Sequence, residues 1–340
     1  MSEIKDLLVD DFDIWSATSG GVLHYNRAAR RFRRFTRLDG LAGNQIHALA
    51  ADDSGDLWFG TDGEGLSRFH RDTSTFDSPF LEFRDLRISS LLADGNRLYV
   101  GTNEGISVFL IDKQEVKESY RRLGNLAKDS EVTALEIHDG VLFAGTIVGL
   151  AWARLDQTNL QDPDSWRSRA PSSPVVDIVA AGGLVHVGTR YGTWTYNPTT
   201  NEFYHDFTRR GISAVGALND VGIAATVAGD FVLRRGRDDW QRIGAPLITE
   251  VATASQSGRD HLWLGTSDGL RVVGQNAPSI PASGEPGSSR FYGIALVGED
   301  ELWAASVPDD QQRTLSAGAY HLADGTWTVF DRASGAPNNE

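Results

Sequence analysis

The stretch that decides the fold reads Leu57-Trp58-Phe59-Gly60-Thr61-Asp62-Gly63-Glu64-Gly65-Leu66-Ser67-Arg68-Phe69. Two runs rich in apolar residues flank a glycine-rich turn, a pattern that predicts a hairpin of two antiparallel strands. Weaker copies recur along the whole chain, and the position of Thr61 is taken in turn by Thr18, Thr61, Thr102, Thr146, Thr189, Thr226, Thr266 and Ser306. The copies are 43, 41, 44, 43, 37, 40 and 40 residues apart. A period of about 40–50 residues is typical of the blades of a β-propeller.

Each repeat can be divided into four short strands. In the second repeat these strands are residues 45–50, 57–61, 65–69 and 80–83, and turn-forming residues occupy positions 52–56. The connections are too short for a crossover helix, so the sheets must be antiparallel. The predicted fold class is therefore all-β: a β-propeller of four-stranded antiparallel blades.

Eight copies of the motif predict eight blades in a single domain that spans residues 1–340. The alternative count is seven, with one degenerate copy acting as a strap. The first copy begins with its own inner strand and the last ends with its own outer strand, so we expect the ring to close by side-chain packing alone. The predicted blades cover residues 4–37, 44–83, 86–121, 131–168, 174–208, 211–244, 248–282 and 289–331.

The residue types of the motif have structural explanations. Trp58 is expected to pack between neighbouring blades, because buried aromatic residues contribute much of the apolar area of such interfaces. Gly60 lets two blades approach closely, and Gly63 and Gly65 permit a turn with positive φ. We interpret all four residues as structural.

Composition limits the classes of function. Hydrophobic residues make up 40% of the chain, with nine Trp, fifteen Phe and eight Tyr, which is enough for a sizeable core. The absence of cysteine excludes disulfides, thiolate nucleophiles and cysteine-ligated zinc, and fits a reducing compartment. Residues 1–6 are polar and acidic, and no 18-residue apolar run follows, so neither a secretory leader nor membrane insertion is predicted. The expected location is cytoplasmic if Met1 is the native start, and periplasmic or extracellular if the chain was trimmed from a longer one.

The net charge of −14 argues against a nucleic-acid partner, because phosphate neutralisation requires clustered Lys and Arg. One segment differs from this average: residues 27–37 contain six arginines and no acidic residue. Such a segment fits an exposed outer strand that its charges keep from pairing with other chains, which is the interpretation we favour. The alternative is a docking edge for an acidic partner.

The pattern Asp-x-x-Gly-x-Leu-Trp-Phe-Gly-Thr-x-x-Gly-x-Gly-Leu over residues 52–66 resembles the two-component regulator propeller repeat of bacteria. The resemblance covers nearly the whole chain and is most specific in the second and seventh repeats. It implies a propeller that recognises a ligand or partner, in many relatives a glycan fragment. Unlike the full-length sensors of that family, the chain has no transmembrane span, no kinase-like region and no room for an immunoglobulin-like domain, so direct signalling is not expected.

No catalytic residue, metal site or cofactor is predicted. The eight histidines are scattered, without a His-Glu-x-x-His or His-x-His pair. Residues 53–58 overlap the Asp-box of sialidases, which is a structural hairpin even in those enzymes. The blades are also similar to those of streptogramin lyases, whose motif reads Leu-Trp-Phe-Thr, but the glycine inserted before Thr61 argues against that family.

Ligands of propellers usually bind over the central channel, at the face that carries the turns between second and third strands and the starts of the inner strands. Variable loops on a rigid scaffold are suited to recognition. The candidate binding residues there are Asn44, Asp62, Glu64, Arg87, Asn103, Glu104, Glu131, Arg190, Tyr191, Glu250, Asp268 and Arg290. Arg190 and Tyr191 are the preferred contact point, because Arg and Tyr are enriched in binding hot spots. An insertion at residues 307–316 extends a turn on this face and is a lid, a partner-binding loop or a disordered segment.

Three functions are considered. The preferred one is a non-enzymatic scaffold that binds a protein or peptide. The second is a receptor for an oligosaccharide or another small ligand, which would need an aromatic platform, and only Tyr191, Phe291 and Tyr292 offer one. The third is a lyase or hydrolase, which a histidine clustered with carboxylates at the channel mouth would support.

Overall fold

A computed structural model describes residues 4–9, 13–26, 31–169, 173–207 and 212–218 and, after these, the strands from β21 to β31. Side chains are described for residues 4–9, 13–26, 33–169, 173–205 and 212–216. Contacts divide the chain into two compact units, Met1–Ile280 and Pro281–Glu340. The single domain over residues 1–340 stays a prediction.

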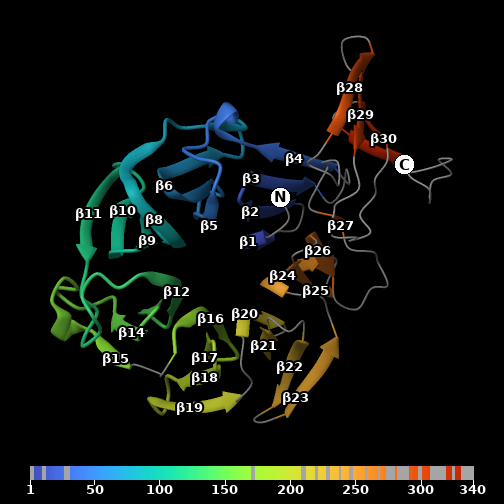
Figure 1. Ribbon diagram of the computed structural model, residues 1–340. Helices are drawn as coiled ribbons and strands as arrows, with labels where there is room; N and C mark the ends of the chain where they lie inside the picture. Colours follow the sequence, from blue (N-terminus) through green and yellow to red (C-terminus); the bar gives the residue numbers. More distant parts are fainter. Residues whose placement is uncertain are drawn as a thin grey trace. The chain divides into compact units, whose positions relative to one another are not determined.

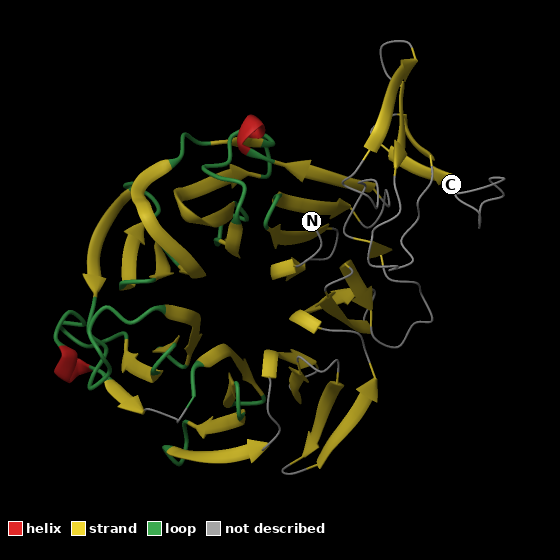
Figure 2. Ribbon diagram, viewed as in Figure 1, coloured by secondary structure: helices red, strands yellow, loops and turns green. Residues whose placement is uncertain are grey.

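The described residues are almost entirely β-structure. They contain only two short 3-10 helices, η1 (Arg37–Asp39) and η2 (Pro163–Ser165), and the strands pair antiparallel in sheets that follow chain order (Figure 2). The predicted fold class, all-β with four-stranded antiparallel sheets, is confirmed.

Six of the described sheets have four strands. The first contains β1 (Ile4–Val9), β2 (Asp13–Thr18), β3 (Gly21–Asn26) and β4 (Arg31–Phe35). The fourth repeat forms β12 (Val132–His138), β13 (Val141–Thr146), β14 (Gly149–Arg154) and β15 (Arg167–Arg169). The fifth forms β16 (Val175–Ala181), β17 (Leu184–Thr189), β18 (Gly192–Asn197) and β19 (Glu202–Phe207).

The later repeats have the same strand order. The sixth forms β20 (Ile212–Leu218), β21 (Val221–Thr226), β22 (Asp230–Gly236) and β23 (Asp239–Gly244). The seventh forms β24 (Ile248–Gln256), β25 (Arg259–Thr266), β26 (Gly269–Val272) and β27 (Ile280–Pro281). The eighth forms β28 (Phe291–Val297), β29 (Glu301–Ser306), β30 (Ala319–Ala323) and β31 (Thr326–Phe330).

The second and third repeats share one seven-stranded sheet. Its strands are β5 (Ile46–Ala51), β6 (Leu57–His70), β7 (Thr75–Phe76), β8 (Phe80–Asp94), β9 (Arg97–Thr102), β10 (Gly105–Leu110) and β11 (Glu115–Tyr120). The sequence predicts a break between residues 83 and 86, but β8 runs through it. The cause is an extra set of pairs, in which Asp62 lies opposite Arg87 and Glu64 opposite Arg84, so that the turn of the second repeat joins the sheet.

The innermost strands of the first unit contact one another in chain order. β1 contacts β5, β5 contacts β8, and the series continues through β12, β16, β20 and β24, which in turn contacts β1 (Figure 1). Each inner strand of the first unit therefore has a neighbouring inner strand on both sides, as in the centre of a propeller.

Glycines of the motif set the spacing between neighbouring repeats. A Cβ added to Gly60 would collide with Ile88, one added to Gly101 would lie 2.9 Å from Val132, and one added to Gly145 would collide with Val175. The partner is in each case the residue of the next inner strand that pairs with the motif threonine of its own repeat. The interpretation of Gly60 as a close-approach glycine is confirmed, and Gly63 and Gly65 have the expected positive φ of 85° and 118°.

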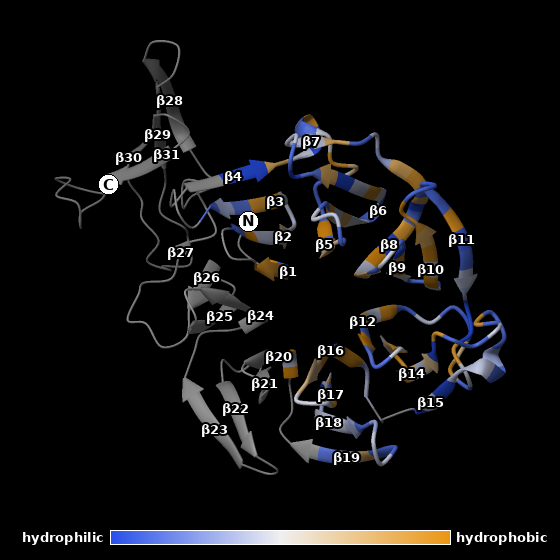
Figure 3. Ribbon diagram, turned by 180° about the vertical axis from the view of Figure 1, so that it is seen from behind, coloured by the Kyte–Doolittle hydropathy of each residue, from blue (hydrophilic) through white to orange (hydrophobic). Residues whose placement is uncertain are grey.

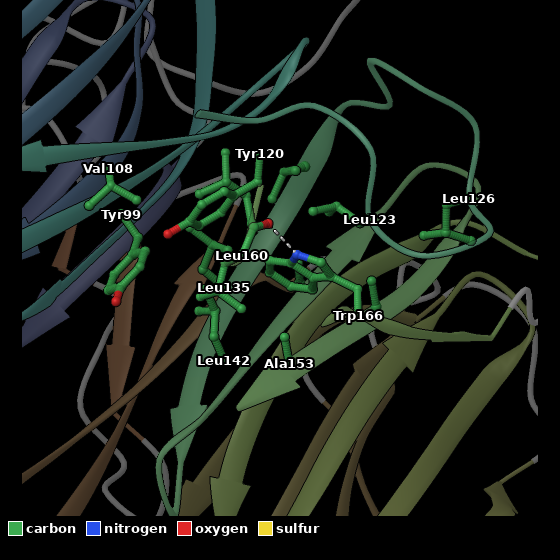
Figure 4. Packing of buried hydrophobic residues seen from close by; sticks show 14 residues of the cluster. Tyr99, Val108, Tyr120, Leu123, Leu126, Leu135, Leu142, Ala153, Leu160 and Trp166 are labelled. Carbon is green, nitrogen blue, oxygen red and sulfur yellow. Dashed lines mark hydrogen bonds between the residues drawn. The ribbon is translucent and has the colours of Figure 1, made fainter. Parts of the chain in front are cut away.

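The core consists of apolar layers between adjacent sheets. Trp58 packs with Leu98, Val100 and Phe109 of the third repeat, which confirms its predicted place between blades. In the layer drawn in Figure 4, Trp166 of the fourth repeat packs with Tyr120 of the third and donates its indole N–H to the carbonyl of Leu160 at 2.8 Å. Outer strands such as β11 and β15 are mostly hydrophilic, as Figure 3 shows.

The sequence predictions for two outer strands, β4 and β27, can be compared with the structure. The arginine-rich β4 lies at the edge of its sheet, as the favoured interpretation of residues 27–37 expects, and Phe35 on it is buried under the Arg33 guanidinium. The outer strand of the seventh repeat, placed in doubt by its prolines, is reduced to the two residues Ile280–Pro281 of β27.

Candidate functional site

The inner strands begin, and the second strands turn into the third, at one end of the sheets. In the fourth and fifth repeats the motif threonine at the end of the second strand pairs with the first residue of the inner strand, as Thr146 does with Val132, and in the second and third repeats Thr61 and Thr102 make the corresponding pairs with Ile46 and Ile88. We call this end the turn face. It comprises the turns 62–64, 103–104, 147–148 and 190–191 and the strand starts near residues 44–47, 87–89, 131–133 and 173–176.

A threonine hydroxyl closes each described turn. Thr61 Oγ1 donates to the carbonyl of Gly65 at 2.7 Å and accepts from the N–H of Glu64 at 3.0 Å. Thr146 and Thr189 make the corresponding bonds to Gly149 and Gly192, at 2.7 and 2.9 Å. All three threonines are buried, so the positions of the turns are fixed by the scaffold beneath them.

Three predicted residues from three successive repeats meet at the centre of the turn face. The Arg87 guanidinium donates through Nε to Asp62 at 3.1 Å and through Nη1 to Glu131 at 3.4 Å. Ser89 Oγ also donates to Glu131, at 3.2 Å. The hydrogen bond to Asp62 and the charges of both acids raise the pKa of Arg87, so this residue stays cationic. Its side chain remains about half exposed.

In each inner strand of the first unit a β-bulge follows the residue that pairs with the motif threonine and adds one residue to the strand. In the second repeat the bulged residue is His47, whose Nε2 lies 3.9 Å from Asp62 Oδ2. Burial lowers the pKa of His47, although the Asp62 charge opposes this shift, so the imidazole is neutral at pH 7. The third and fourth repeats present Ser89 and Thr133 at the equivalent position.

The remaining acidic and amide candidates with described side chains bind neighbouring groups of the same chain. Glu64 accepts from Arg37 Nη1 at 3.3 Å, and Glu104 lies 3.0 Å from Arg121 Nη2. The side-chain carbonyl of Asn44 accepts from the N–H of Arg37, and that of Asn103 from the N–H of Arg87, both at 2.9 Å. The two asparagines therefore hold the segments that lead into the inner strands.

A cleft of about 490 Å³ opens at the second repeat, within the size range of small-ligand pockets. It is lined by turn and linker residues, among them Arg37, Glu64, Leu81 and Arg84. No ion pair of Arg84 exists among the described residues.

The turns of the fourth and fifth repeats differ from those of the second and third. Their tips are Ile147-Val148 and Arg190-Tyr191, without an acidic residue. Ile147, Val148 and Tyr191 are 44%, 38% and 53% exposed. Arg190 is exposed as well and has no ion pair within the described part of the chain.

The structure thus brings Asp62, Arg87 and Glu131 together and places Arg190 and Tyr191 at exposed turn tips. Glu250 lies on β24, two residues after the strand begins, and pairs with Gly265 of β25. It occupies the register position that Asp6 has on β1 and Asp177 on β16. Asp268, Arg290 and the insertion 307–316 lie outside the described residues, as do the side chains of Phe291 and Tyr292.

Sequence reasoning missed the bulged residues His47, Ser89 and Thr133. It also missed the apolar turn tip Ile147-Val148. Both sets have a signal in the sequence. The bulged residues follow an Ile or Val and precede a small or acidic residue in nearly every repeat, as in Ile46-His47-Ala48. Ile147 and Val148 are apolar where the second repeat has Asp62 and Glu64.

The described side chains show no group of three His, Cys, Asp or Glu residues that could hold a metal ion. At the turn face His47 is too far from Asp62 for a hydrogen bond, and Asp62 is already bound to Arg87. Nucleophilic catalysis uses a base that is hydrogen-bonded to an orienting carboxylate. The described residues at the turn face contain no such pair. None of the described helices is long and apolar enough to cross a membrane.

Three solved structures share the fold over 98% of this chain. PorZ of Porphyromonas gingivalis, a surface component of the type-IX secretion system, has a TM-score of 0.69 at 16% identity, with 46% of PorZ covered. The extracellular domains of BT3049 and BT4673 from B. thetaiotaomicron, described as a hybrid two-component and a one-component system, have TM-scores of 0.66 and 0.65 at 17% and 18% identity, with 48% and 51% of each covered. The chain spans about half the length of these structures.

No curated protein sequence matches the chain. The family model of the two-component regulator propeller matches residues 40–63, which hold the turn of the second repeat and the strand before it. The resemblance seen in the sequence is confirmed at this segment, and the chain is a β-propeller that carries the two-component regulator propeller repeat.

Proposed function

We propose that the protein is a non-enzymatic module that binds another protein or a peptide through its turn face. The distribution of exposed apolar residues carries this proposal. Six large apolar side chains are exposed among the described residues, and five of them lie on or beside the turn face: Leu38, Leu81, Ile147, Val148 and Tyr191. Only Val116 lies elsewhere, on the outer strand β11. Apolar side chains gathered on one face are typical of interaction surfaces.

The similar structures support a role in recognition. Two are extracellular domains of proteins described as one- or two-component systems, and PorZ is a component of a secretion system. We therefore favour the periplasmic or extracellular location over the cytoplasmic one for this chain. Immunoblots of fractionated native cells test the location, and a signal confined to the cytoplasmic fraction would contradict it.

We further propose a seven-blade ring for the first unit, the alternative of the two predicted counts, because the contact of β24 with β1 completes the series of seven inner strands. Class averages from electron microscopy count the blades directly, and eight blades in the ring would exclude this proposal.

Two other functions have less support. An oligosaccharide receptor would stack sugar rings on aromatic side chains, and Tyr191 is the one exposed large aromatic residue in the described part of the chain. A lyase or hydrolase would use His47, which is neutral but has no hydrogen-bonded carboxylate among the described residues.

Affinity capture from the native cell tests the proposed face. The bait variant Ile147→Asp/Val148→Asp places two charges on the apolar tip, and Arg190→Ala/Tyr191→Ala truncates the adjacent tip. The matched control is Val116→Asp, which likewise replaces an exposed apolar side chain by a charged one, but on an outer strand. We expect the two turn variants to lose a partner that wild type and Val116→Asp both retain.

Circular dichroism melts must show that all variants fold like wild type. Equal recovery of every partner by wild type, both turn variants and the control would exclude the turn face as the binding surface.

A further inference from the structure

The tips of the fourth and fifth repeats form a patch whose charge differs from the rest of the turn face. The patch consists of Ile147, Val148, Arg190 and Tyr191, and it contains a cation and no acid. On the second and third repeats the turn acids Asp62, Glu64 and Glu104 are each paired with an arginine. In a chain with net charge −14, the patch therefore combines exposed apolar area with an arginine that no described carboxylate neutralises.

The two tips belong to sheets that pack directly on each other. Thr133 Oγ1 of the fourth repeat donates to the carbonyl of Val175 of the fifth at 2.8 Å, and Gly145 lies against Val175. Below the tips, Phe143 and Leu150 pack with Val185 and Val187 in one buried cluster. The tips thus project from one continuous core.

The turns are also ordered before any partner arrives. The buried hydroxyls of Thr146 and Thr189 close them through bonds to Gly149 and Gly192. Val148 and Tyr191 donate their own N–H groups to these hydroxyls, at 3.2 and 3.3 Å. A surface that is already fixed loses little conformational entropy on binding.

We propose, building on the function proposed above, that this patch binds a segment of another protein in which an apolar side chain stands next to an aspartate or glutamate. The apolar side chain covers Ile147 and Val148, and the carboxylate accepts hydrogen bonds from the Arg190 guanidinium. Arg binds carboxylates through two parallel N–H groups, and such charge-assisted bonds are stronger than neutral ones. Tyr191 adds the rigid aromatic area common in hot spots.

The inference is tested with three fluorescein-labelled 12-residue peptides on a Ser/Gly background, whose central residues are Leu-Glu-Leu-Glu, Leu-Lys-Leu-Lys or Ser-Glu-Ser-Glu. Fluorescence anisotropy with the full chain should show that the first peptide binds at least about tenfold more tightly than the others. Arg190→Glu should reverse the preference in favour of the lysine peptide. Ile147→Ser/Val148→Ser should weaken the first peptide by about tenfold or more.

The matched controls are Arg154→Glu, which changes an exposed arginine on β14 that is paired with Asp156, and Val116→Ser on β11. Both should leave the affinities unchanged. Equal binding of the acidic and basic peptides, or no effect of Arg190→Glu, would overturn the inference. So would a dimer in sedimentation velocity that Arg190→Glu dissociates, because the occupant would then be a second copy.

The outcome can be separated from that of the proposed function. If peptide binding shows no charge preference while Ile147→Asp/Val148→Asp still loses a cellular partner, the turn face binds proteins and only the acidic segment is wrong. If no variant of the face loses a partner, the proposed function itself fails.

Discussion

Thr61 shows why the repeat keeps a hydroxyl at one position. Its Oγ1 is buried, donates to the carbonyl of Gly65 and accepts from the N–H of Glu64, so it satisfies two backbone groups of a tight turn. Asp52 and Trp58, two other residues of the motif, are linked in a similar way. Asp52 Oδ2 accepts the indole N–H of Trp58 at 2.9 Å, and Oδ1 accepts the N–H groups of Ser54 and Asp56.

We expect Thr61→Val to lower the free energy of unfolding by about 1–3 kcal/mol, because the isosteric side chain leaves buried backbone groups without partners. Urea denaturation followed by tryptophan fluorescence measures the change. Thr61→Ser keeps the hydroxyl and should cost less than half as much. Equal effects of Val and Ser would show that the methyl group, not the hydroxyl, stabilises the turn.

At the scale of the strand, two features recur in the inner strands: a bulge after the residue that pairs with the motif threonine, and contact of that residue with a glycine of the preceding repeat. Ile88, Val132 and Val175 each fill the space that the absent Cβ of a motif glycine leaves. A β-branched residue at the start of an inner strand and a glycine before the motif threonine are therefore a matched pair across each interface.

We expect Gly145→Ala to destabilise the protein by about 1–3 kcal/mol, because the added methyl collides with Val175 and interiors tolerate overpacking poorly. Val175→Ala alone should also destabilise it, by leaving a cavity. The double variant should be more stable than the sum of the two changes predicts, a coupling that a double-mutant cycle in urea measures. Additive effects would mean that the two residues do not share this space.

At the scale of the whole molecule, acidic side chains on the inner strands are placed where protonation affects stability. Asp6 on β1 and Asp177 on β16 occupy the same register position, opposite Ala17 and Gly188. Each accepts an N–H bond from the following residue of its own strand and one from the next inner strand, at Leu49 and Val215. Each aspartate thus links two sheets.

Burial raises the pKa of Asp6 to about 6 and that of Asp177 to about 7, and burial together with the charge of Asp177 raises the pKa of Glu136 to about 7. The unfolded chain releases these protons near its ordinary values of 3.8 and 4.5. Between about pH 4 and pH 7 the folded state therefore binds more protons, and stability falls as pH rises.

We expect the protein to be more stable at pH 5 than at pH 8, because the folded state holds these protons over a pH range in which the unfolded chain has released them. Urea denaturation over this pH range measures the slope. Asp177→Asn, which removes the titrating proton and keeps one of the two N–H acceptors, should flatten it. Stability that rises from pH 5 to pH 8 would contradict the direction of these shifts.

Much of the fold and part of the site follow from local sequence. The spacing of the Thr61-type residues and the alternation around them predict the four-stranded antiparallel sheets, because strand pairing between neighbours in the chain depends on short-range pattern. The turns of that pattern also locate the turn face and its residues Asp62, Arg190 and Tyr191. The extra pairs that join the second and third repeats break the pattern, so the continuous β8 was not predicted.

The sequence by itself therefore determined the repeat, the fold class and the face on which to look for a partner. Only the tertiary structure decided that Arg87 joins Asp62 and Glu131 from two other repeats, that Asp6 and Asp177 link neighbouring sheets, and that the apolar tip Ile147-Val148 projects from the same core as Arg190-Tyr191. The physical reason is distance along the chain. Contacts within a hairpin depend on adjacent residues, whereas contacts between repeats about 40 residues apart depend on how closely whole sheets pack.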